Sequence, residues 1–499
     1  MLCKVIIASF LLVLGFCREC RELKTEAGKV CICDSKYCDS IEKLTLSPGS
    51  YQIYTTSEKK LGFSSSLGEL LENQHAAAEN YISVNPETTY QTIVGFGGAF
   101  TDSTGISVNA LPKRAQKLLL NSLFGDDGVR YSLCRVPIAG TDFSKRQYTY
   151  ADDYGNDLEM THFKLQPEDT DIKIPLIKKA LELTRNQLEL FASSWTVPAW
   201  MKTNNFTGVT MLKEEFYQAW ANYYLRFFEE YSKQGIHFWG MTTQNEPLDG
   251  IYPFFAQGLN WLGFYPHQMN KWVGNYLGPT IRNSPFRYLK IMLHDDNRFT
   301  LPFLPLQLEN DETIKYADGV AIHFYWDTYY PNSFLEYTKS SKKDLFLLAT
   351  EACYGPVSIG NWTRAEGYIE SIIFDLQHNS VGWVDWNMVL NENGGPTLLN
   401  PLDAAIMINS TSGQFYKLPI YYALGHFSKF IRPGSVRIET TFLHRTANVN
   451  AIAFKRPDNV IAVIFYNGGP SETTIHITTH QGDIVHIIQS KSINTILFQ

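Results

Sequence analysis

The sequence has little clustered positive charge. Its 499 residues include 43 lysines and arginines against 50 aspartates and glutamates, which gives a formal net charge of -7 at pH 7. Proteins that bind nucleic acids concentrate Lys and Arg where these residues can neutralise phosphates. We therefore expect no nucleic-acid partner.

Long hydrophobic runs are also missing beyond the first residues. Val5–Phe16, which follows Lys4, is an apolar run of 12 residues, whereas a membrane-spanning helix needs about 20. A basic start, a short apolar stretch and small residues near Cys17 are typical of a signal peptide. The sequence predicts a cleaved signal at residues 1–17 and an exported protein.

Several catalytic motifs are absent. The sequence has no H-E-x-x-H, no G-x-S-x-G and no Walker loop, which argues against a zinc protease, an α/β-hydrolase and a P-loop enzyme. Gly95-Phe-Gly97-Gly98 lacks the later glycine of a dinucleotide fingerprint, so we interpret it as a tight turn. No metal and no organic cofactor are expected.

Most of the cysteines lie near the N-terminus. Six of the eight fall within the first 38 residues, and four of these remain after signal cleavage: Cys20, Cys31, Cys33 and Cys38. Zinc sites favour C-x-x-C pairs, which this cluster lacks, and exported proteins form disulfides. Two local disulfides allow three connectivities, of which we favour Cys20–Cys31 with Cys33–Cys38. Export also agrees with three glycosylation acceptor sequences, at Asn205, Asn361 and Asn409.

The middle of the chain has an alternating pattern. Short apolar runs rich in β-branched residues alternate with longer amphipathic stretches, which indicates parallel strands joined by helices. The eight runs are Thr92–Gly98, Arg130–Ile138, Gln187–Trp195, Phe238–Glu246, Tyr288–Asp296, Gly319–Tyr325, Leu345–Ala352 and Val381–Met388. Helices are expected at Leu111–Phe124, Ile172–Leu183, Leu212–Lys233 and Arg364–His378. Eight units of this kind predict an α/β fold, the (β/α)8 TIM barrel, with a doubly wound open sheet as the alternative.

The two flanks of this region have a different period. Residues 44–58 and 435–499 alternate apolar and polar side chains, as half-buried antiparallel strands do. One flank precedes the barrel and the other follows it, so we expect a single β-sandwich built from both chain ends. The predicted domains are a disulfide-rich segment at 18–43, a β-sandwich at 44–90 and 431–499, and a catalytic barrel at 91–430.

Two glutamates end predicted barrel strands. The fourth predicted strand ends in Thr243–Pro247, which contains Glu246. The seventh ends in Thr350–Cys353, which contains Glu351. The C-terminal ends of barrel strands form the active site of this fold, and glycoside hydrolysis requires two carboxyl groups. Each glutamate alone is more simply explained as a strand end or a helix cap, but the pair favours a glycosidase. A separation of about 5 to 5.5 Å would mean retention of configuration, and about 6.5 to 9.5 Å inversion.

Several longer motifs resemble glycoside hydrolase family 30, and within it the glucosylceramidase branch. They are Arg135–Ile138, Thr141–Phe143, Ser194–Trp200, Met241–Pro247, Gly382–Asn387 and Tyr422–Phe430. The resemblance spans almost the whole chain. It implies a barrel with an associated β-sandwich, and retaining cleavage of β-glucose from ceramide in the lysosome. It also implies that Glu246 is the acid/base and Glu351 the nucleophile.

The resemblance assigns further residues and partners. It implies a glucose-binding set of Asp142, Trp195, Asn245, Trp386 and Asn400, and a supporting set of Arg135, His323 and Tyr325. Contact with a membrane surface, a saposin-type activator and a lysosomal membrane receptor are implied as well. The sequence differs from the family pattern in a shorter Gly395–Asp403 segment and in Phe324, which replaces an expected tryptophan. Other family activities, such as a β-xylosidase or an endo-glucanase, and an inactive sugar-binding protein are the alternatives.

Overall fold

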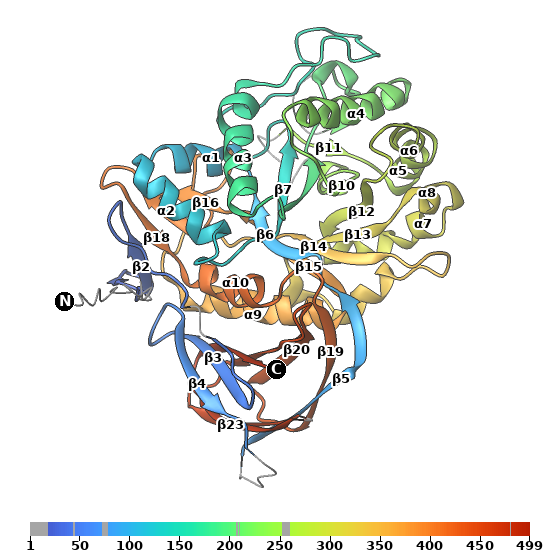
Figure 1. Ribbon diagram of the computed structural model, residues 1–499. Helices are drawn as coiled ribbons and strands as arrows, with labels where there is room; N and C mark the ends of the chain where they lie inside the picture. Colours follow the sequence, from blue (N-terminus) through green and yellow to red (C-terminus); the bar gives the residue numbers. More distant parts are fainter. Residues whose placement is uncertain are drawn as a thin grey trace, which may run out of the picture.

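The structure is a computed structural model that describes residues 18–42, 45–71, 78–205, 208, 210–251, 260–479 and 481–499. The predicted signal peptide at 1–17 lies outside these residues. Within the described part, the chain forms a barrel domain and a second, all-β domain below it in Figure 1. None of the helices in the described part is long and apolar enough to cross a membrane.

Eight parallel strands close into a barrel, so the open-sheet alternative is wrong. In chain order they are β6 (Gly95–Ala99), β7 (Leu133–Ile138), β8 (Glu189–Ser194), β10 (Gly240–Thr242), β12 (Lys290–Asn297), β13 (Gly319–His323), β14 (Phe346–Glu351) and β15 (Ser380–Asn387). Each overlaps one of the eight predicted runs. Side chains such as Leu133, Phe191 and Leu348 fill the barrel interior, as expected for this fold.

Helices surround the barrel and pack against it through buried side chains. They are α1 (Asp102–Asn109), α2 (Lys113–Phe124), α3 (Ile174–Leu183), α4 (Tyr217–Lys233), α5 (Pro266–Trp272), α6 (Gly278–Arg282), α7 (Pro305–Leu308), α8 (Asp311–Tyr316), α9 (Trp362–Gln377) and α10 (Pro419–Phe430). In α4, for example, Trp220, Tyr224 and Phe227 are buried, and their spacing of three to four residues puts them on one side of the helix. The four helices predicted from the sequence correspond to α2, α3, α4 and α9.

Both flanks of the chain form one nine-stranded sheet, as predicted. Three strands precede the barrel, β3 (Ser50–Ser57), β4 (Ser64–Glu69) and β5 (Asn80–Thr92), and six follow it, β19 (Val436–His444), β20 (Val449–Lys455), β21 (Ile461–Asn467), β22 (Thr473–Thr479), β23 (Gly482–Ile488) and β24 (Ser492–Phe498). The sheet curls in Figure 1, and its core includes a cluster of buried aliphatic and aromatic residues. It contacts α10, where Tyr54 packs against Phe430 with ring centroids 4.5 Å apart and 36° between the planes.

The N-terminal segment belongs to a smaller sheet that the sequence did not reveal. It contains the disulfides Cys20–Cys31 and Cys33–Cys38, the pairing that we favoured. Its strands β1 (Glu22–Lys24) and β2 (Lys29–Cys33) join β18 (Gln414–Lys417), β17 (Ile406–Asn409) and β16 (Val389–Asn391). These strands are five residues or shorter, too short to show a clear period.

Candidate active site

Glu246 and Glu351 lie at the C-terminal end of the barrel and face one another. Glu351 is the last residue of β14, and each glutamate is only 6% exposed. One carboxylate oxygen of each, together with a ring nitrogen of His323, forms a group whose atoms lie within 4.8 Å of one another. The fold therefore brings both predicted carboxyl groups to one point.

Glu246 does not lie on the strand as the sequence suggested. The prediction extended the fourth strand to Glu246, but β10 ends at Thr242. Glu246 has a φ of 41°, a left-handed conformation that a strand excludes and that functional sites often hold under strain. Its backbone N–H donates to the Asp295 carbonyl at 2.9 Å, so the neighbouring strand β12 fixes the turn.

The carboxylate of Glu351 accepts hydrogen bonds from Tyr325, just after β13, and from Arg135 on β7. The Tyr325 hydroxyl donates to Oε1 at 2.8 Å, and Arg135 on β7 forms a short ion pair with Oε2. The Arg135 guanidinium is fully buried, and it also donates to Asp295 at 2.6 Å and Asn245 at 2.9 Å. The ion pair and the hydroxyl donor together fix the position of the Glu351 carboxylate.

Glu246 has an environment that favours its protonated form. Burial, helped by the negative charges of Asp249 and Glu351 and opposed by His323, raises the pKa of this carboxyl to about 7. His323 Nδ1 lies 2.9 Å from Glu246 Oε1, and the Asn297 amide donates to the same oxygen at 3.3 Å. Two neighbouring carboxyl groups with unlike environments are the arrangement that separates an acid from a base or nucleophile.

His323 and Asp295 connect the two carboxyl groups. His323 Nε2 lies 3.1 Å from Asp295 Oδ1. Burial by itself would lower the pKa of His323, but Glu351, Asp295 and Glu246 raise it well above the ordinary value. Burial by itself would raise the pKa of Asp295, but the positive charges of Arg135 and His323 outweigh this effect and hold the pKa below its ordinary value. Asp295 thus carries the negative charge that keeps both cations in place.

A bulge in β12 directs Asp295 into the barrel. The pairing of β12 with β13 shifts register between His294 and Asp296, and His294 and Asp295 have φ angles of 76° and 55°. A bulge re-aims a side chain in this way. Arg298, which follows β12, lies outside this cluster and pairs with Asp327 and Asp375, at 2.9 and 2.5 Å.

The two predicted sugar-binding tryptophans stack on each other. The ring centroids of Trp195 and Trp386 lie 4.9 Å apart, with 18° between the planes, and Arg135 lies 4.7 Å from the Trp195 centroid. At most one face of each indole is therefore free for a sugar. Trp195 also lines a small hollow together with Asp142.

Asp142 lies on the loop after β7, with a raised pKa. Burial and the negative charge of Glu351 raise the pKa of Asp142 to about 7. The loop is held by Asp102, whose carboxylate accepts a hydrogen bond from Ser144 at 2.6 Å. Leu398 donates its backbone N–H to the Asp142 carbonyl at 2.7 Å, which brings the Gly395–Asp403 segment to the site.

The two predicted asparagines differ in position. Asn245 is 1% exposed, and its Oδ1 accepts the hydrogen bond from Arg135. Its Nδ2 has no hydrogen-bond partner among the described residues, so one donor remains for a ligand. Asn400, in contrast, is exposed on its loop. The structure thus groups Asn245, but not Asn400, with the buried residues of the site.

Several polar residues of the site were missed in the sequence. Thr242 and Thr350 donate to the Asp295 carboxylate at 2.6 and 2.7 Å, and the Cys353 sulfur lies 3.1 Å from the Tyr325 hydroxyl. Thr242 and Thr350 lie on β10 and β14, where alternate residues face the inside of the barrel, whereas Cys353 lies just after β14. Phe324 obeys the same rule, since it packs on Tyr368 and Trp383 behind the strand.

The cluster of Glu246, His323 and Glu351 has a spacing that a metal ion can bridge. However, His323 already lies within hydrogen-bond distance of Glu246 and Asp295, and the cation of Arg135 contacts Glu351. A second positive charge beside Arg135 is electrostatically unfavourable. The donor set therefore suits a hydrogen-bonded pair of carboxyl groups better than a metal.

The predicted glycosylation residues lie away from this site. Asn205 is exposed with a φ of 59°, and Asn409 ends β17. Asn361 is the N-cap of α9, where its side chain accepts a hydrogen bond from the Thr363 backbone N–H at 3.0 Å. Modification at these three positions stays a prediction.

Comparison with known proteins agrees with this architecture. Residues 93–431 match the Glycosyl hydrolase family 30 TIM-barrel domain, and residues 434–496 match the Glycosyl hydrolase family 30 beta sandwich domain. Lysosomal acid glucosylceramidase of Mus musculus is 37% identical over 489 residues, covering 94% of this chain and 93% of the mouse protein.

Solved structures show the same fold. The crystal structure of SrfJ from Salmonella typhimurium has a TM-score of 0.82 and 26% identity, covering 90% of this chain and 99% of that one. An endo-β1,6-glucanase has a TM-score of 0.80 with 24% identity, covering 91% and 99%. The motifs, the two matched domains and the glutamate pair lead to one conclusion. The protein is a glycoside hydrolase that belongs to family 30.

Proposed function

We propose that this enzyme is a retaining β-glucosidase that hydrolyses glucosylceramide through a covalent glucosyl-enzyme intermediate. The observation that carries the proposal is the proximity of the Glu246 and Glu351 carboxylate oxygens, which lie within 4.8 Å. Retaining glycosidases separate their carboxyl groups by about 5 to 5.5 Å, and inverting enzymes leave room for a water at about 6.5 to 9.5 Å. A spacing within 4.8 Å is nearer to the retaining range than to the inverting one.

In the first step, the ionised carboxylate of Glu351 attacks the anomeric carbon. Glu246 donates its proton to the glycosidic oxygen as the bond to that oxygen breaks, and ceramide leaves as the alcohol. The raised pKa of Glu246, about 7, keeps this proton available at acidic and near-neutral pH. The product of the step is a glucosyl ester of Glu351.

In the second step, Glu246 acts as a base. It removes a proton from water, the water oxygen attacks the anomeric carbon, and the ester bond to Glu351 breaks. Glucose leaves with its original β configuration because the carbon has been inverted twice. Glu246 is protonated again, and Glu351 returns to its ionised form beside Arg135 and Tyr325.

The neighbouring residues bind the sugar and hold the carboxyl groups. Asn245 has a free Nδ2 donor, suited to the sugar 2-hydroxyl, where hydrogen bonds strengthen in the transition state. Asp142 accepts sugar hydroxyls by charge-assisted hydrogen bonds when it is ionised, and Trp195 offers one apolar face. Arg135, His323 and Tyr325 are positioning residues that set the charge and orientation of the glutamates.

The choice of glucosylceramide rests on relatives rather than on the pocket. The mouse relative is named a lysosomal acid glucosylceramidase, and the sequence motifs belong to that branch. We therefore also propose a lysosomal location and contact with a membrane surface, where a ceramide substrate resides. A saposin-type activator and a lysosomal membrane receptor remain predictions from the resemblance alone.

Glucose release from glucosylceramide tests the proposal. We expect activity in the wild-type protein and losses of about 10³-fold or more in Glu351→Gln, which removes the nucleophile. Glu246→Gln should retain formation of the intermediate from substrates with good leaving groups, because these need no proton donor. Full activity in either variant, or no activity of the wild type on any β-glucoside, would refute the proposal.

A further inference from the structure

A cavity lies at the other end of the barrel, where β7 and β8 begin. It has a volume of about 520 Å³, and its wall includes Ser132 and Glu189 at the start of these strands. Ser428 at the end of α10 and Pro457 between β20 and β21 complete it. The cavity therefore lies between the barrel base and the sheet domain, far from the strand ends that carry Glu246 and Glu351.

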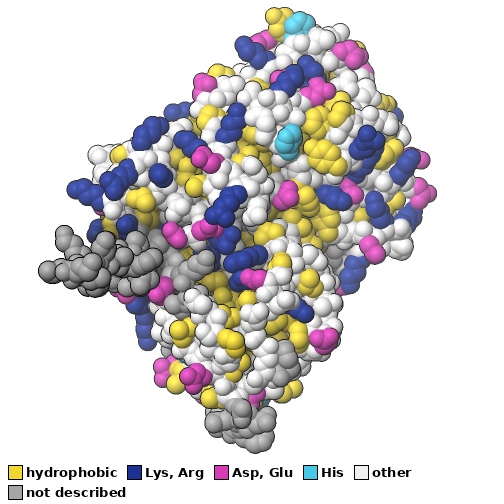
Figure 2. Space-filling view, in the orientation of Figure 1, with side chains coloured by type: hydrophobic (Ala, Val, Ile, Leu, Met, Phe, Trp, Pro, Cys, Tyr) yellow, Lys and Arg dark blue, Asp and Glu magenta, His cyan; other side chains and the backbone are white. Residues whose placement is uncertain are grey.

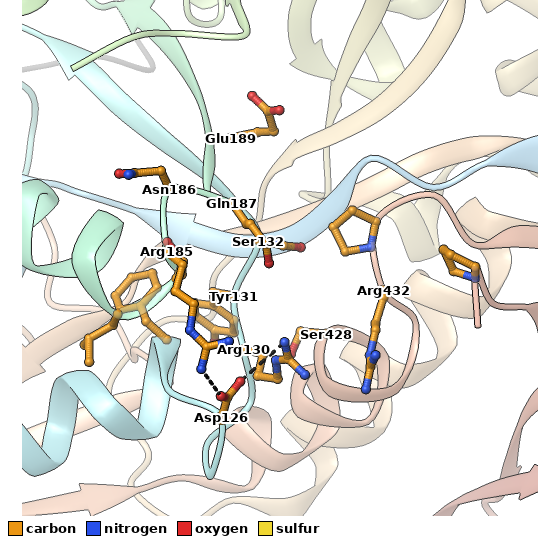
Figure 3. A pocket seen from close by; sticks show the side chains of 15 residues that line it. Asp126, Arg130, Tyr131, Ser132, Arg185, Asn186, Gln187, Glu189, Ser428 and Arg432 are labelled. Carbon is orange, nitrogen blue, oxygen red and sulfur yellow. Dashed lines mark hydrogen bonds and ion pairs between the residues drawn. The ribbon is translucent and has the colours of Figure 1, made fainter. Parts of the chain in front are cut away.

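Three arginines line this cavity: Arg130, Arg185 and Arg432. They come from three separate loops, and Figure 3 shows Arg130 and Arg185 on either side of Asp126 with Arg432 next to them. Figure 2 shows several Lys and Arg side chains gathered at the waist between the two domains. This concentration is unusual in a protein with a net charge of -7.

Carboxylates neutralise this cluster only in part. Arg130 and Arg185 share Asp126, at 3.4 and 2.9 Å, while Arg432 and Arg456 share Asp458, at 3.3 and 2.5 Å. Four guanidinium groups thus pair with two carboxylates. Glu189 also lines the cavity, but Figure 3 shows its carboxylate directed away from the guanidinium groups.

Other observations indicate surplus positive charge at this place. Lys429 donates to the Asp126 backbone carbonyl at 2.5 Å. Burial lowers the pKa of Lys429 to about 8, with Arg130 and Arg432 lowering it and Asp127 and Asp126 opposing them. The Arg432 Nε is buried and has no hydrogen-bond partner among the described residues. A guanidinium with a free buried donor is prepared to bind an acceptor.

We propose that this cavity is a binding site for a phosphate-bearing ligand, held by Arg130, Arg185 and Arg432. Guanidinium groups bind phosphate oxygens in a bidentate manner, and three of them converge here from different loops. A volume of about 520 Å³ exceeds that of a phosphate ion and is typical of sites for small organic molecules. The ligand is a phosphate monoester or diester, either free or as a lipid headgroup.

The proposal is independent of the catalytic one, because none of these residues belongs to the active site. It is tested by titration calorimetry with sodium pyrophosphate at constant ionic strength, and by sedimentation with vesicles of phosphatidylcholine containing phosphatidic acid. The variants are the double change Arg130→Gln/Arg432→Gln and the single change Arg185→Gln. The Arg185 side chain is 79% exposed, so we expect its replacement to leave folding unchanged. Arg226→Gln on α4 is the matched control, since Arg226 is 32% exposed and Arg130 33%.

We expect saturable binding of pyrophosphate that falls about tenfold or more in the double variant, because each lost guanidinium removes charge-assisted hydrogen bonds. Arg185→Gln should weaken it about threefold, and Arg226→Gln should not change it. If the wild-type protein binds the vesicles but not pyrophosphate, and the vesicle binding shows the same dependence on the arginines, the ligand is a lipid headgroup. Equal binding by the double variant and the wild type, or no binding of either probe, would overturn the proposal.

Discussion

The C-terminal end of the barrel and the core of the sheet domain are both closed to solvent, but they bury opposite kinds of side chain. The barrel end encloses Arg135, Asp295 and His323, each at most 1% exposed. The sheet domain encloses residues such as Val463, Phe465 and Ile477. Buried charge is expensive and is retained where chemistry needs it, whereas buried apolar surface stabilises the fold. Changes in the two regions should therefore affect different properties.

The largest expected effect is on stability, in the sheet domain. Phe465 on β21 is fully buried, and Phe465→Ala leaves a cavity. We expect the free energy of unfolding to fall by about 3–5 kcal/mol, while kcat per folded molecule stays within about twofold. Urea unfolding followed by active-site titration measures both. A large loss of kcat with unchanged stability would break the comparison.

In the barrel, a change of charge without a change of shape should mainly affect activity. Asp295→Asn keeps the side-chain volume but removes the charge that faces Arg135 and His323. We expect kcat/KM to fall about 100-fold, roughly 2.7 kcal/mol of transition-state stabilisation. The control is Asp375→Asn, a buried aspartate that pairs with Arg298 outside the catalytic cluster. Equal losses in both variants would mean that any buried ion pair matters in the same way.

The pH dependence should separate the two regions as well. Since burial raises the pKa of Glu246 from 4.5 to about 7, the proton donor is lost as the pH rises through this value. We expect kcat/KM to fall about tenfold per pH unit above about 7. The folded state also binds this proton more tightly than the unfolded chain does, so the associated stability is present below pH 4.5 and is lost toward pH 7.

Profiles of kcat/KM against pH measure the first effect. With an activated aryl glucoside, Glu246→Gln should lose this alkaline limb, because the leaving group needs no proton. A limb that persists unchanged in Glu246→Gln would assign it to another group, of which Asp142, with a pKa also near 7, is the first to examine.

The smallest expected effect comes from single hydroxyl groups. Tyr325→Phe removes one hydrogen bond to Glu351 and should lower kcat about fivefold with little change in KM, since about 1 kcal/mol is typical of such a bond. Tyr466→Phe removes a hydroxyl of the sheet domain that donates to Glu366 on α9 and should leave kcat unchanged. Steady-state kinetics of both variants, with thermal unfolding as a check, distinguish a catalytic from a purely structural hydroxyl.

Much of this organisation could be predicted from the sequence, because it is periodic or local. The alternation of apolar runs and amphipathic stretches predicted all eight barrel strands, and the flanks predicted a sheet from both chain ends. Glu246 and Glu351 were identified because strand ends meet at one rim. Their roles in catalysis remain predictions until they are measured.

Other features depend on tertiary contacts that the sequence does not show. A bulge in β12 makes Asp295 the centre of the site. β10 ends at Thr242, and the left-handed φ angle of Glu246 keeps this residue out of the strand. The stacking of Trp195 on Trp386 joins residues almost 200 positions apart. The basic cavity likewise collects arginines from three loops that show no common motif.

The central claim is that two carboxyl groups within reach of one anomeric carbon cleave the bond with retention. Proton NMR during the first turnovers of an aryl β-glucoside tests it most directly, because the anomeric signal of glucose is read before mutarotation. We predict that β-glucose appears first and the α anomer only later. Initial release of α-glucose would mean inversion and would contradict the account.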